Sequence, residues 1–259
     1  MKIFFIVDET SFFLPQWLDG VIENLKKHHG IIGITPLITH GKPTFYNYIY
    51  KNFLSIGISS IIKILIGYVS ILIKKFLFFV NLSSVPMSIS QVAKKRKIKT
   101  ITTENVNDTT YLDMLRRLKP DIIVSSCSQI FRKELLSLPK IGCINRHSGL
   151  LPSYGGVFPV FYAMINNEKY IGVTVHRMEQ AIDSGSILYQ EKIQINKNDT
   201  LFSLYEKAYK VSVNATIYAV EVICGNQRPH ILSVKKSSYY SFPKKTDWDE
   251  FRKLRLKFV

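Results

Sequence analysis

Short apolar segments alternate along this chain with longer segments of helical periodicity, and this alternation constrains the fold more than any other feature. Strand-like runs cover residues 2–7, 31–38, 121–125 and 141–147, with a shorter one near 99–102. Helical patterns cover residues 15–28, 53–81, 88–96 and 109–118. Strands that alternate with helices are typical of parallel βαβ units. We therefore predict an α/β protein with a Rossmann-like, mostly parallel sheet and helices on both faces.

The second half of the chain continues with a different spacing. A helix is expected over 158–166, two strands over 170–178 and 186–195, and a long helix over 200–223. Asn198–Thr200 can cap the long helix, and Gly225 can end it. We see no internal repeat and no long linker. The sequence predicts one main domain over 1–197, with an apolar helical insertion at about 53–81, and a C-terminal helix and tail over 198–259 that pack on it.

The formal net charge of +16 and the pI near 9.7 describe a strongly basic chain. Such a surface attracts nucleic acid, an anionic membrane or a small polyanion such as a nucleotide diphosphate, and solvated lysines are the plain alternative. The three cysteines, Cys127, Cys143 and Cys224, cannot all pair, and none belongs to a Cys-x-x-Cys motif. We expect a reduced, cytoplasmic protein without a structural metal.

The apolar segment 53–81 invites comparison with a membrane span. Lys63, Lys74 and Lys75 divide it into runs that are too short to cross a bilayer. We expect buried or half-buried helices packed on the sheet, and we keep peripheral membrane contact as the alternative.

Asn145 and His147 stand two residues apart at the end of the strand over 141–147, so their side chains leave the same face. Ligands of open parallel sheets bind beyond the carboxyl ends of the strands, and Ser126–Gln129 ends the preceding strand at that edge. Asp183 on a later loop could complete a triad. An amide, an imidazole and a carboxylate at one point can polarise a carbonyl and move protons around it. Taken alone, Asn145 could instead cap a turn, and His147 could be a core histidine.

The surrounding segments occur in a specific order: Asn145-Arg146-His147, Leu150-Leu151-Pro152-Ser153-Tyr154, Gly172–His176 and Asp183-Ser184-Gly185. This set resembles the 10-formyltetrahydrofolate-dependent formyltransferase family, strongly over about residues 85–195. The motif of that family runs Asn-x-His-x-Ser-Leu-Leu-Pro-x-Tyr-Arg-Gly, followed later by Asp-Thr-Gly. Here Gly149 replaces the serine and Gly155 replaces the arginine. The missing arginine leaves the class of acceptor substrate undetermined, but it does not change the type of reaction that the motif implies.

The resemblance implies formyl transfer from 10-formyltetrahydrofolate to an amine, without a metal. Asn145 and His147 would donate hydrogen bonds to the oxyanion, and Asp183 would orient His147 or a bridging water and help to remove the amine proton. His176 is expected to be structural. The backbone of two segments would hold the pterin: Ser128, Gln129, Ile130 and Phe131, and Gln180, Ala181 and Ile182. The side chains of Tyr154, Phe158 and Tyr162 would contact the acceptor, with packing in the core as the alternative.

Members of this family formylate methionyl-tRNA, glycinamide ribonucleotide or nucleotide-linked amino sugars. The residues that follow the segment 183–195 are too few for the C-terminal barrel of the tRNA enzymes. The resemblance therefore indicates the sugar N-formyltransferase branch, with a nucleotide-linked 4-amino-4,6-dideoxysugar as acceptor. GDP-perosamine, in O-antigen and lipopolysaccharide biosynthesis, is our best guess. We expect a homodimer that does not bind nucleic acid. A methionyl-tRNA formyltransferase-like enzyme and a non-catalytic basic binding module are the alternatives.

Overall fold

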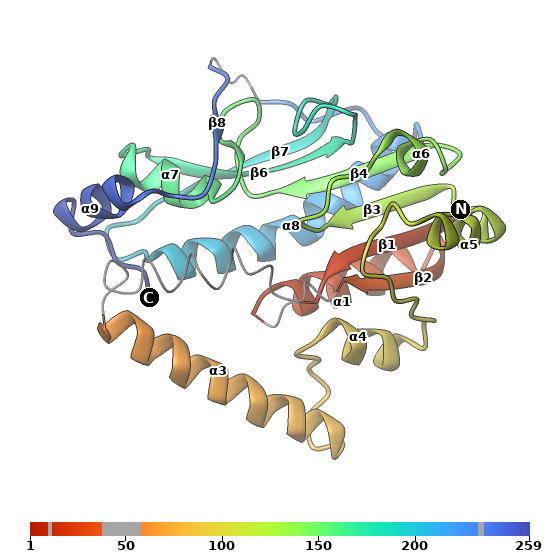
Figure 1. Cartoon of the computed structure of the whole chain (residues 1–259), viewed down its shortest axis with the longest axis horizontal. Helices are drawn as coiled ribbons and strands as arrows, with labels where there is room; N and C mark the ends of the chain where they lie inside the picture. Colours follow the sequence, from red (N-terminus) through yellow and green to blue (C-terminus); the bar gives the residue numbers. More distant parts are fainter. Residues whose placement is uncertain (10–11, 38–57, 233–235) are drawn as a thin grey trace.

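A six-stranded sheet, with strand order β2-β1-β3-β4-β6-β7, forms the centre of the computed structural model, which describes residues 1–9, 12–37, 58–232 and 236–259 (Figure 1). Four strands are parallel: β1 (Lys2–Asp8), β2 (Gly30–Leu37), β3 (Ile122–Ser126) and β4 (Gly142–His147). The sheet continues with β6 (Tyr170–Arg177), antiparallel to β4, and β7 (Ile187–Gln194), antiparallel to β6. The prediction of a mostly parallel α/β sheet is confirmed.

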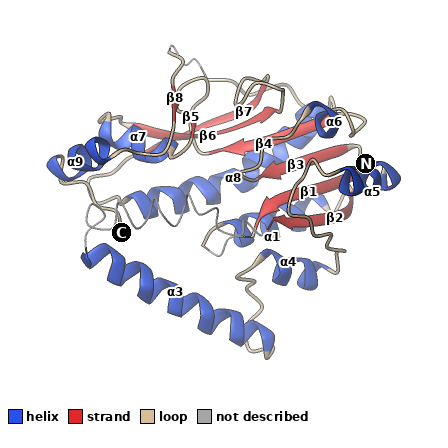
Figure 2. Cartoon of the chain, in the orientation of Figure 1, coloured by secondary structure: helices blue, strands red, loops and turns tan. Residues whose placement is uncertain are grey.

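Helices cover both faces of the sheet (Figure 2). One face packs against α1 (Leu14–Leu25), α4 (Ile89–Arg96), α7 (Pro159–Ile165) and α8 (Leu201–Ile223). The other face packs against α5 (Thr109–Leu118) and α6 (Lys133–Leu136). In β1, Ile3 and Phe5 belong to the first core, whereas Phe4 and Ile6 belong to the second. Because successive side chains alternate between faces, one continuous apolar strand supplies both cores.

Most predicted elements lie within two residues of their observed positions, and two differ more. Helix α1 ends at Leu25 rather than at residue 28, because the chain turns toward β2, where the Gly30 N–H donates to the carbonyl of Met1 at 2.8 Å. The strand expected near 99–102 is wrong, since Thr100 forms only an isolated bridge to Ile34. Residues 38 and 53–57 of the predicted segments lie outside the described residues.

Helix α3 (Ile58–Phe79) corrects the expectation that the apolar segment packs on the sheet. Ile71 is buried, but most of the other described apolar side chains of α3 are exposed. Figure 1 shows α3 on the outer side of α1 and α4, so the sheet face that it was expected to cover belongs to other helices. Among the described residues, no helix has the length and apolarity needed to span a bilayer.

The C-terminal tail contains two elements to which the sequence analysis assigned no structure. Strand β8 (Tyr239–Tyr240) pairs in parallel with β5 (Gly155–Gly156) to form a separate two-stranded sheet. Helix α9 (Lys245–Lys253) places Trp248 and Phe251 on the Phe161 ring of α7, at centroid distances of 4.7 and 5.1 Å. The tail thus covers α7 and reaches the loop that follows β4.

Candidate active site

The end of β4 directs Asn145 and His147 away from the face that is covered by α8 and holds Arg146. Arg146 is buried, donates from Nε to Ser212 Oγ of α8 at 2.9 Å, and lies over the Tyr209 ring at 3.8 Å. Side chains alternate along a strand, so anchoring Arg146 against α8 sends its two neighbours to the opposite face. The amide and the imidazole therefore share one face.

Asp183, on the loop between β6 and β7, brings its carboxylate to His147. Asp183 Oδ2 lies 3.9 Å from His147 Nδ1 and accepts a hydrogen bond from the Gly156 N–H at 2.8 Å. Asp183 Oδ1 lies 3.5 Å from Nε2 of His176. The three residues singled out from the motif, Asn145, His147 and Asp183, therefore meet in one cluster, together with a second histidine.

That second histidine, His176, connects the amide to the carboxylate. The antiparallel register of β4 and β6 sets it opposite Asn145, whose Nδ2 lies 3.5 Å from His176 Nε2. His176 Nδ1 donates to the Arg177 carbonyl at 2.7 Å, so Nε2 is the nitrogen that faces both the Asn145 amide and Asp183 Oδ1. The sequence analysis treated His176 as structural. The signal that could have found it is the strand pairing, because residues opposite each other in a ladder have neighbouring side chains.

Burial and charge leave one of the two central groups neutral and the other ionised. Burial lowers the pKa of His147, although the negative charge of Asp183 acts against this. Burial would raise the pKa of Asp183, but the hydrogen bond from His176, the positive charge that His147 carries at the low pH where Asp183 titrates and the Gly156 N–H together outweigh it and hold the pKa at about 2. At neutral pH the site therefore holds a neutral imidazole beside an ionised carboxylate.

The loop after β4 determines which nitrogen of His147 carries the proton. His147 Nε2 lies 2.7 Å from the Tyr154 carbonyl, which can only accept, so Nε2–H donates and the neutral ring has its lone pair on Nδ1. Gly149 leaves room for this contact, since a Cβ there would lie 2.8 Å from His147 Nε2 and 2.9 Å from the Tyr154 oxygen. The basic nitrogen of His147 consequently faces Asp183.

The first predicted pterin segment has most of its side chains engaged with the protein. Ser128 donates to Asp8 from its backbone N–H at 2.9 Å and from Oγ at 3.4 Å, and burial raises the pKa of Asp8 to about 6. The Gln129 side chain is bonded to the backbone of Val106 and Glu104, and Phe131 is buried in the core. Ile130, in contrast, is 59% exposed.

The second predicted pterin segment, Gln180–Ile182, is exposed throughout. A depression of about 460 Å³ includes Gln180 and Ala181 together with residues of α6, but none of Asn145, His147 and Asp183 lines it. Ile182 is 49% exposed. Each segment therefore offers an exposed isoleucine side chain that is suited to the face of a pterin ring. Within the described part of the chain, no three His, Cys, Asp or Glu side chains gather as metal ligands.

The three predicted acceptor contacts form an aromatic cluster with the tail. Tyr240 stacks on Tyr162 at 4.1 Å and on Tyr154 at 5.7 Å, and the Phe158 ring contacts that of Phe242 at 5.8 Å. Tyr162 is 6% exposed, so its ring is used in packing, as in the alternative stated above. Tyr154 and Phe158 are half-buried.

The sequence analysis missed Tyr239 of β8, which is 60% exposed. A Cβ built on Gly155 would lie 3.4 Å from the Tyr239 ring and 3.7 Å from Asp183 Cβ, so Tyr239 and Asp183 both adjoin this glycine. An arginine at position 155, as in the family motif, would project into the same space. The tail thus contributes an exposed aromatic ring beside the site.

Comparisons with known proteins agree on the type of protein. Residues 81–220 match the formyl transferase family model. Bifunctional polymyxin resistance protein ArnA from Wigglesworthia glossinidia brevipalpis is 38% identical over 169 residues, which are 63% of this chain and 26% of that protein. Methionyl-tRNA formyltransferase from Halothermothrix orenii is 39% identical over 123 residues, which are 47% of this chain and 39% of that protein. The chain thus spans well under half the length of these two relatives.

Solved structures share the fold. An N-formyltransferase from Helicobacter canadensis, in complex with folinic acid and dTDP-3-aminofucose, superposes with a TM-score of 0.56 at 21% identity, covering 93% of this chain and 71% of the other. Phosphoribosylglycinamide formyltransferases are also among the structural neighbours. The family match covers more than half of the chain and includes Asn145, His147 and Asp183. The chain therefore belongs to the formyl transferase family.

Proposed function

We propose that this chain transfers a formyl group from 10-formyltetrahydrofolate to the amine of a nucleotide-linked 4-amino-4,6-dideoxysugar. The observation that carries the proposal is the meeting of Asn145, His147 and Asp183 at the carboxyl end of β4, inside the segment that matches the family. These groups are the ones that acyl transfer to an amine requires without a nucleophilic serine or cysteine.

The geometry refines the roles of the three residues. When the amine attacks the formyl carbon, the formyl oxygen gains negative charge and the amine must lose a proton. Asn145 Nδ2 carries two N–H groups, of which one faces His176, and the other is available to the developing oxyanion. His147 is neutral with its lone pair on Nδ1, so it takes up the amine proton rather than donating to the oxygen. The proton then passes to the departing folate nitrogen.

Asp183 stabilises the protonated form of His147 during this step. The 3.9 Å between its Oδ2 and His147 Nδ1 exceeds a direct hydrogen bond, so the carboxylate acts mainly through its charge. The Gly156 N–H and His176 hold the carboxylate in position. The pterin is proposed to lie between Ser128–Phe131 and Gln180–Ile182, where Ile130 and Ile182 are exposed.

Three observations support an amino sugar as the acceptor. A structural neighbour has been solved with a dTDP-linked amino sugar and a folate. The exposed Tyr239 ring beside Asp183 suits stacking on a sugar or a base. The net charge of +16 suits a diphosphate. GDP-perosamine is the first acceptor to test, and the methionyl-tRNA formyltransferase relatives make charged tRNA the second.

The test is incubation with 10-formyltetrahydrofolate and, separately, GDP-perosamine, dTDP-4-amino-4,6-dideoxyglucose, dTDP-3-aminofucose and methionyl-tRNA, with products identified by mass spectrometry. We expect the original chain to form a formylated sugar and the His147→Asn variant to form none. Asp113→Asn, at an exposed helical position, is the control and should still form the product. Preferential formylation of the tRNA would overturn the proposal that the acceptor is an amino sugar, but not the proposed formyl transfer. No product from any amine would overturn the proposal.

A further inference from the structure

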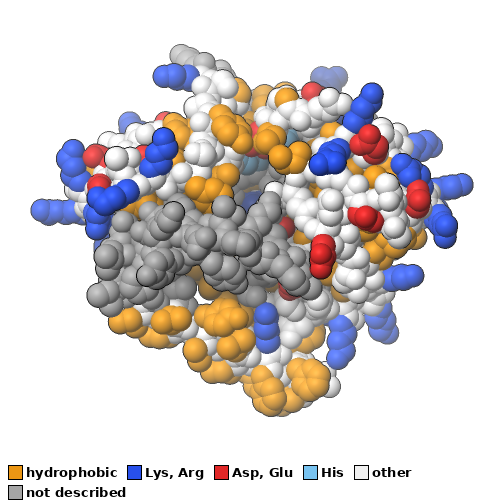
Figure 3. Space-filling view, in the orientation of Figure 1, with side chains coloured by type: hydrophobic (Ala, Val, Ile, Leu, Met, Phe, Trp, Pro, Cys, Tyr) orange, Lys and Arg blue, Asp and Glu red, His pale blue; other side chains and the backbone are white. Residues whose placement is uncertain are grey.

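Helix α3 displays an apolar stripe to solvent. Its members are Ile62, Leu65, Ile66, Val69, Leu72, Ile73, Phe76, Phe79 and Val80. Their spacing of three and four residues puts them along one side of the helix and of the turn at Val80 that directly follows it, and each is between 38% and 70% exposed. Figure 3 shows hydrophobic side chains gathered along the lower edge of the molecule, where α3 lies in Figure 1. A contiguous exposed patch of this kind marks an interaction surface.

The charge around the apolar stripe has one sign. Lys63 and Lys74 lie at the border of the stripe, and α3 contains no acidic residue. The sequence from Asn24 to Thr103 contains twelve lysines and arginines and no aspartate or glutamate, so most of the net charge of +16 lies in this part of the chain. A partner for the stripe is therefore one that carries negative charge.

Specific contacts hold α3 against the folded body with the stripe facing outward. Near one end of the helix, Lys63 Nζ donates to the carbonyl of Val259 at 3.0 Å. Toward the other end, Gln91 Nε2 of α4 donates to the carbonyl of Lys75 at 3.0 Å. Ile71 is buried on the inner side. The exposure of the stripe is therefore part of the folded arrangement.

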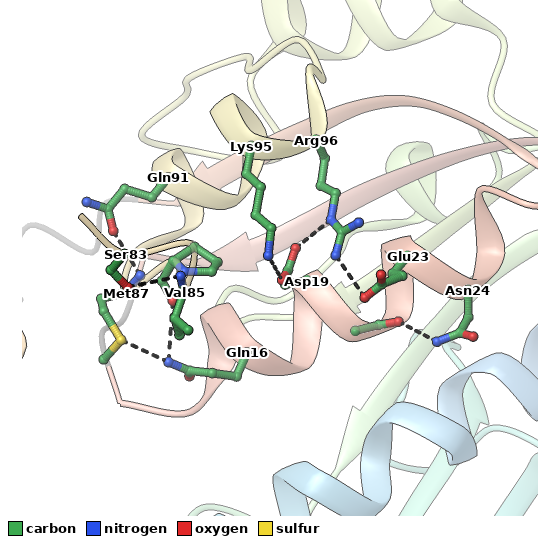
Figure 4. Close-up of polar contacts among 12 residues, drawn as sticks. Gln16, Asp19, Glu23, Asn24, Ser83, Val85, Met87, Gln91, Lys95 and Arg96 are labelled. Carbon is green, nitrogen blue, oxygen red and sulfur yellow. Dashed lines mark hydrogen bonds and ion pairs between the residues drawn. The ribbon is translucent and has the colours of Figure 1, made fainter. Parts of the chain in front are cut away.

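Helix α4 is in turn fixed to α1 by ion pairs (Figure 4). Asp19 of α1 pairs with Lys95 Nζ at 2.7 Å and with Arg96 Nε at 2.5 Å, and Glu23 pairs with Arg96 Nη2 at 3.0 Å. Two of the basic residues that end α4 are thus neutralised within the protein. Lys94, of the same run, lies instead over the Phe79 ring of the stripe, at 5.8 Å from its centroid.

A depression of about 360 Å³ opens where α3 meets α4. Its lining residues are Phe78, Asn81, Ser83, Ser84, Lys94 and Lys95. Amide and hydroxyl groups with a lysine ammonium are the groups that hold a phosphate oxygen. The depression adjoins the Phe79 end of the stripe, so apolar surface and an anion-binding set lie side by side.

We propose that α3 lies in the interfacial plane of an anionic lipid bilayer, with its apolar stripe inserted at the acyl boundary and the bordering lysines at the level of the headgroup phosphates. Interfacial helices combine such an apolar side with lysines along its border, and anionic lipid attracts basic segments. A second copy of this chain fits less well, because its equivalent surface would present the same positive charge with no acidic group to pair.

The test is co-sedimentation of the full chain with vesicles of phosphatidylcholine alone or mixed with phosphatidylglycerol at about seven to three, at low and high salt. We expect binding to the mixed vesicles only, and weaker binding in high salt. Ile66→Asp with Phe76→Asp should weaken partitioning at least tenfold, and Lys74→Glu severalfold. Ile231→Asp, at an exposed apolar position outside the stripe, is the matched control and should bind like the original chain.

Circular dichroism of each variant should show that the fold is retained, since the substituted side chains are exposed. Equal binding to both kinds of vesicle, or equal binding by the double variant and the original chain, would overturn the proposal. Light scattering provides a second test. If the lipid-free chain is a dimer, and Ile66→Asp with Phe76→Asp converts it to monomers, then a second copy covers the stripe and the proposal is overturned.

Discussion

Replacing Asp183 by asparagine should remove a pH-dependent part of the folding stability. The pKa of Asp183 is about 2 in the folded protein, against an ordinary value of 3.8. Each pKa unit corresponds to about 1.4 kcal/mol, so the ionised carboxylate stabilises the folded state by about 2 kcal/mol just above the pH range in which it titrates. In Asp183→Asn, the amide oxygen can still accept from the Gly156 N–H, but the charge that interacts with His147 and His176 is lost.

The sign follows from the lowered pKa. Because the folded state binds this proton more weakly than the unfolded state, the stabilisation is fully present above about pH 4 and disappears as the pH falls through about 2. About half of it remains at pH 3. The free energy of unfolding of the original chain should therefore exceed that of Asp183→Asn by about 2 kcal/mol at pH 4 and by about 1 kcal/mol at pH 3.

Urea unfolding of both chains at pH 7, 4 and 3 measures this difference directly. Asp113→Asn, at an exposed position, reports the general effect of removing one negative charge. A difference between the original chain and Asp183→Asn that stays constant from pH 7 to pH 3 would refute the reasoning, because the contacts of Asp183 would then not stabilise its ionised form.

The same substitution tests the proposed chemistry. At 3.9 Å and an effective dielectric constant of about 20, the carboxylate and a protonated His147 interact by about 4 kcal/mol. We expect kcat to fall by about a thousandfold, within the range for a lost acid–base partner, while KM for both substrates changes little. A kcat within fivefold of the original value would remove Asp183 from the mechanism.

Three further substitutions test other parts of the structure. Gly156→Ala should lower the free energy of unfolding in urea by more than about 2 kcal/mol, because φ is +88° and the new Cβ would lie 2.1 Å from a carbonyl oxygen of β8. Gly225→Ala is the control, since φ there is +81° but the space is open, and it should cost about 1 kcal/mol. Equal costs would contradict the close approach of β8. Phe161→Ala should cost about 3–5 kcal/mol by the same measurement, since the ring is fully buried beneath α9, and a cost below about 1 kcal/mol would contradict that packing. Gly149→Ser should lower kcat by displacing the His147 ring, and an unchanged rate would show that the ring position does not matter.

The sequence predicted the sheet and the position of Asn145 and His147 because both depend on local periodicity. The alternation of side chains in β4 follows from strand geometry alone, and the buried Arg146 on the opposite face agrees with it. His176 was missed as a partner because its contacts depend on which residues of β4 and β6 face each other, and this register joins residues 31 positions apart.

The exposure of α3 could not be predicted for a different reason. A segment rich in isoleucine and leucine indicates an apolar helix, but its position depends on which other segments already cover the sheet. Here α1, α4 and α8 occupy that face. The tail strand was missed because two residues are too few for a periodicity, and their pairing depends on the close approach that Gly155 and Gly156 permit.

The pairing of β5 with β8 has a consequence for synthesis of the protein. Gly155 N–H donates to Ser238, Tyr154 N–H donates to Ser238 Oγ, and Val157 N–H donates to Tyr240. A nascent polypeptide on the ribosome would carry Asn145, His147 and Asp183 long before the segment that fastens the intervening loop. We expect turnover to begin only after translation has passed Tyr240.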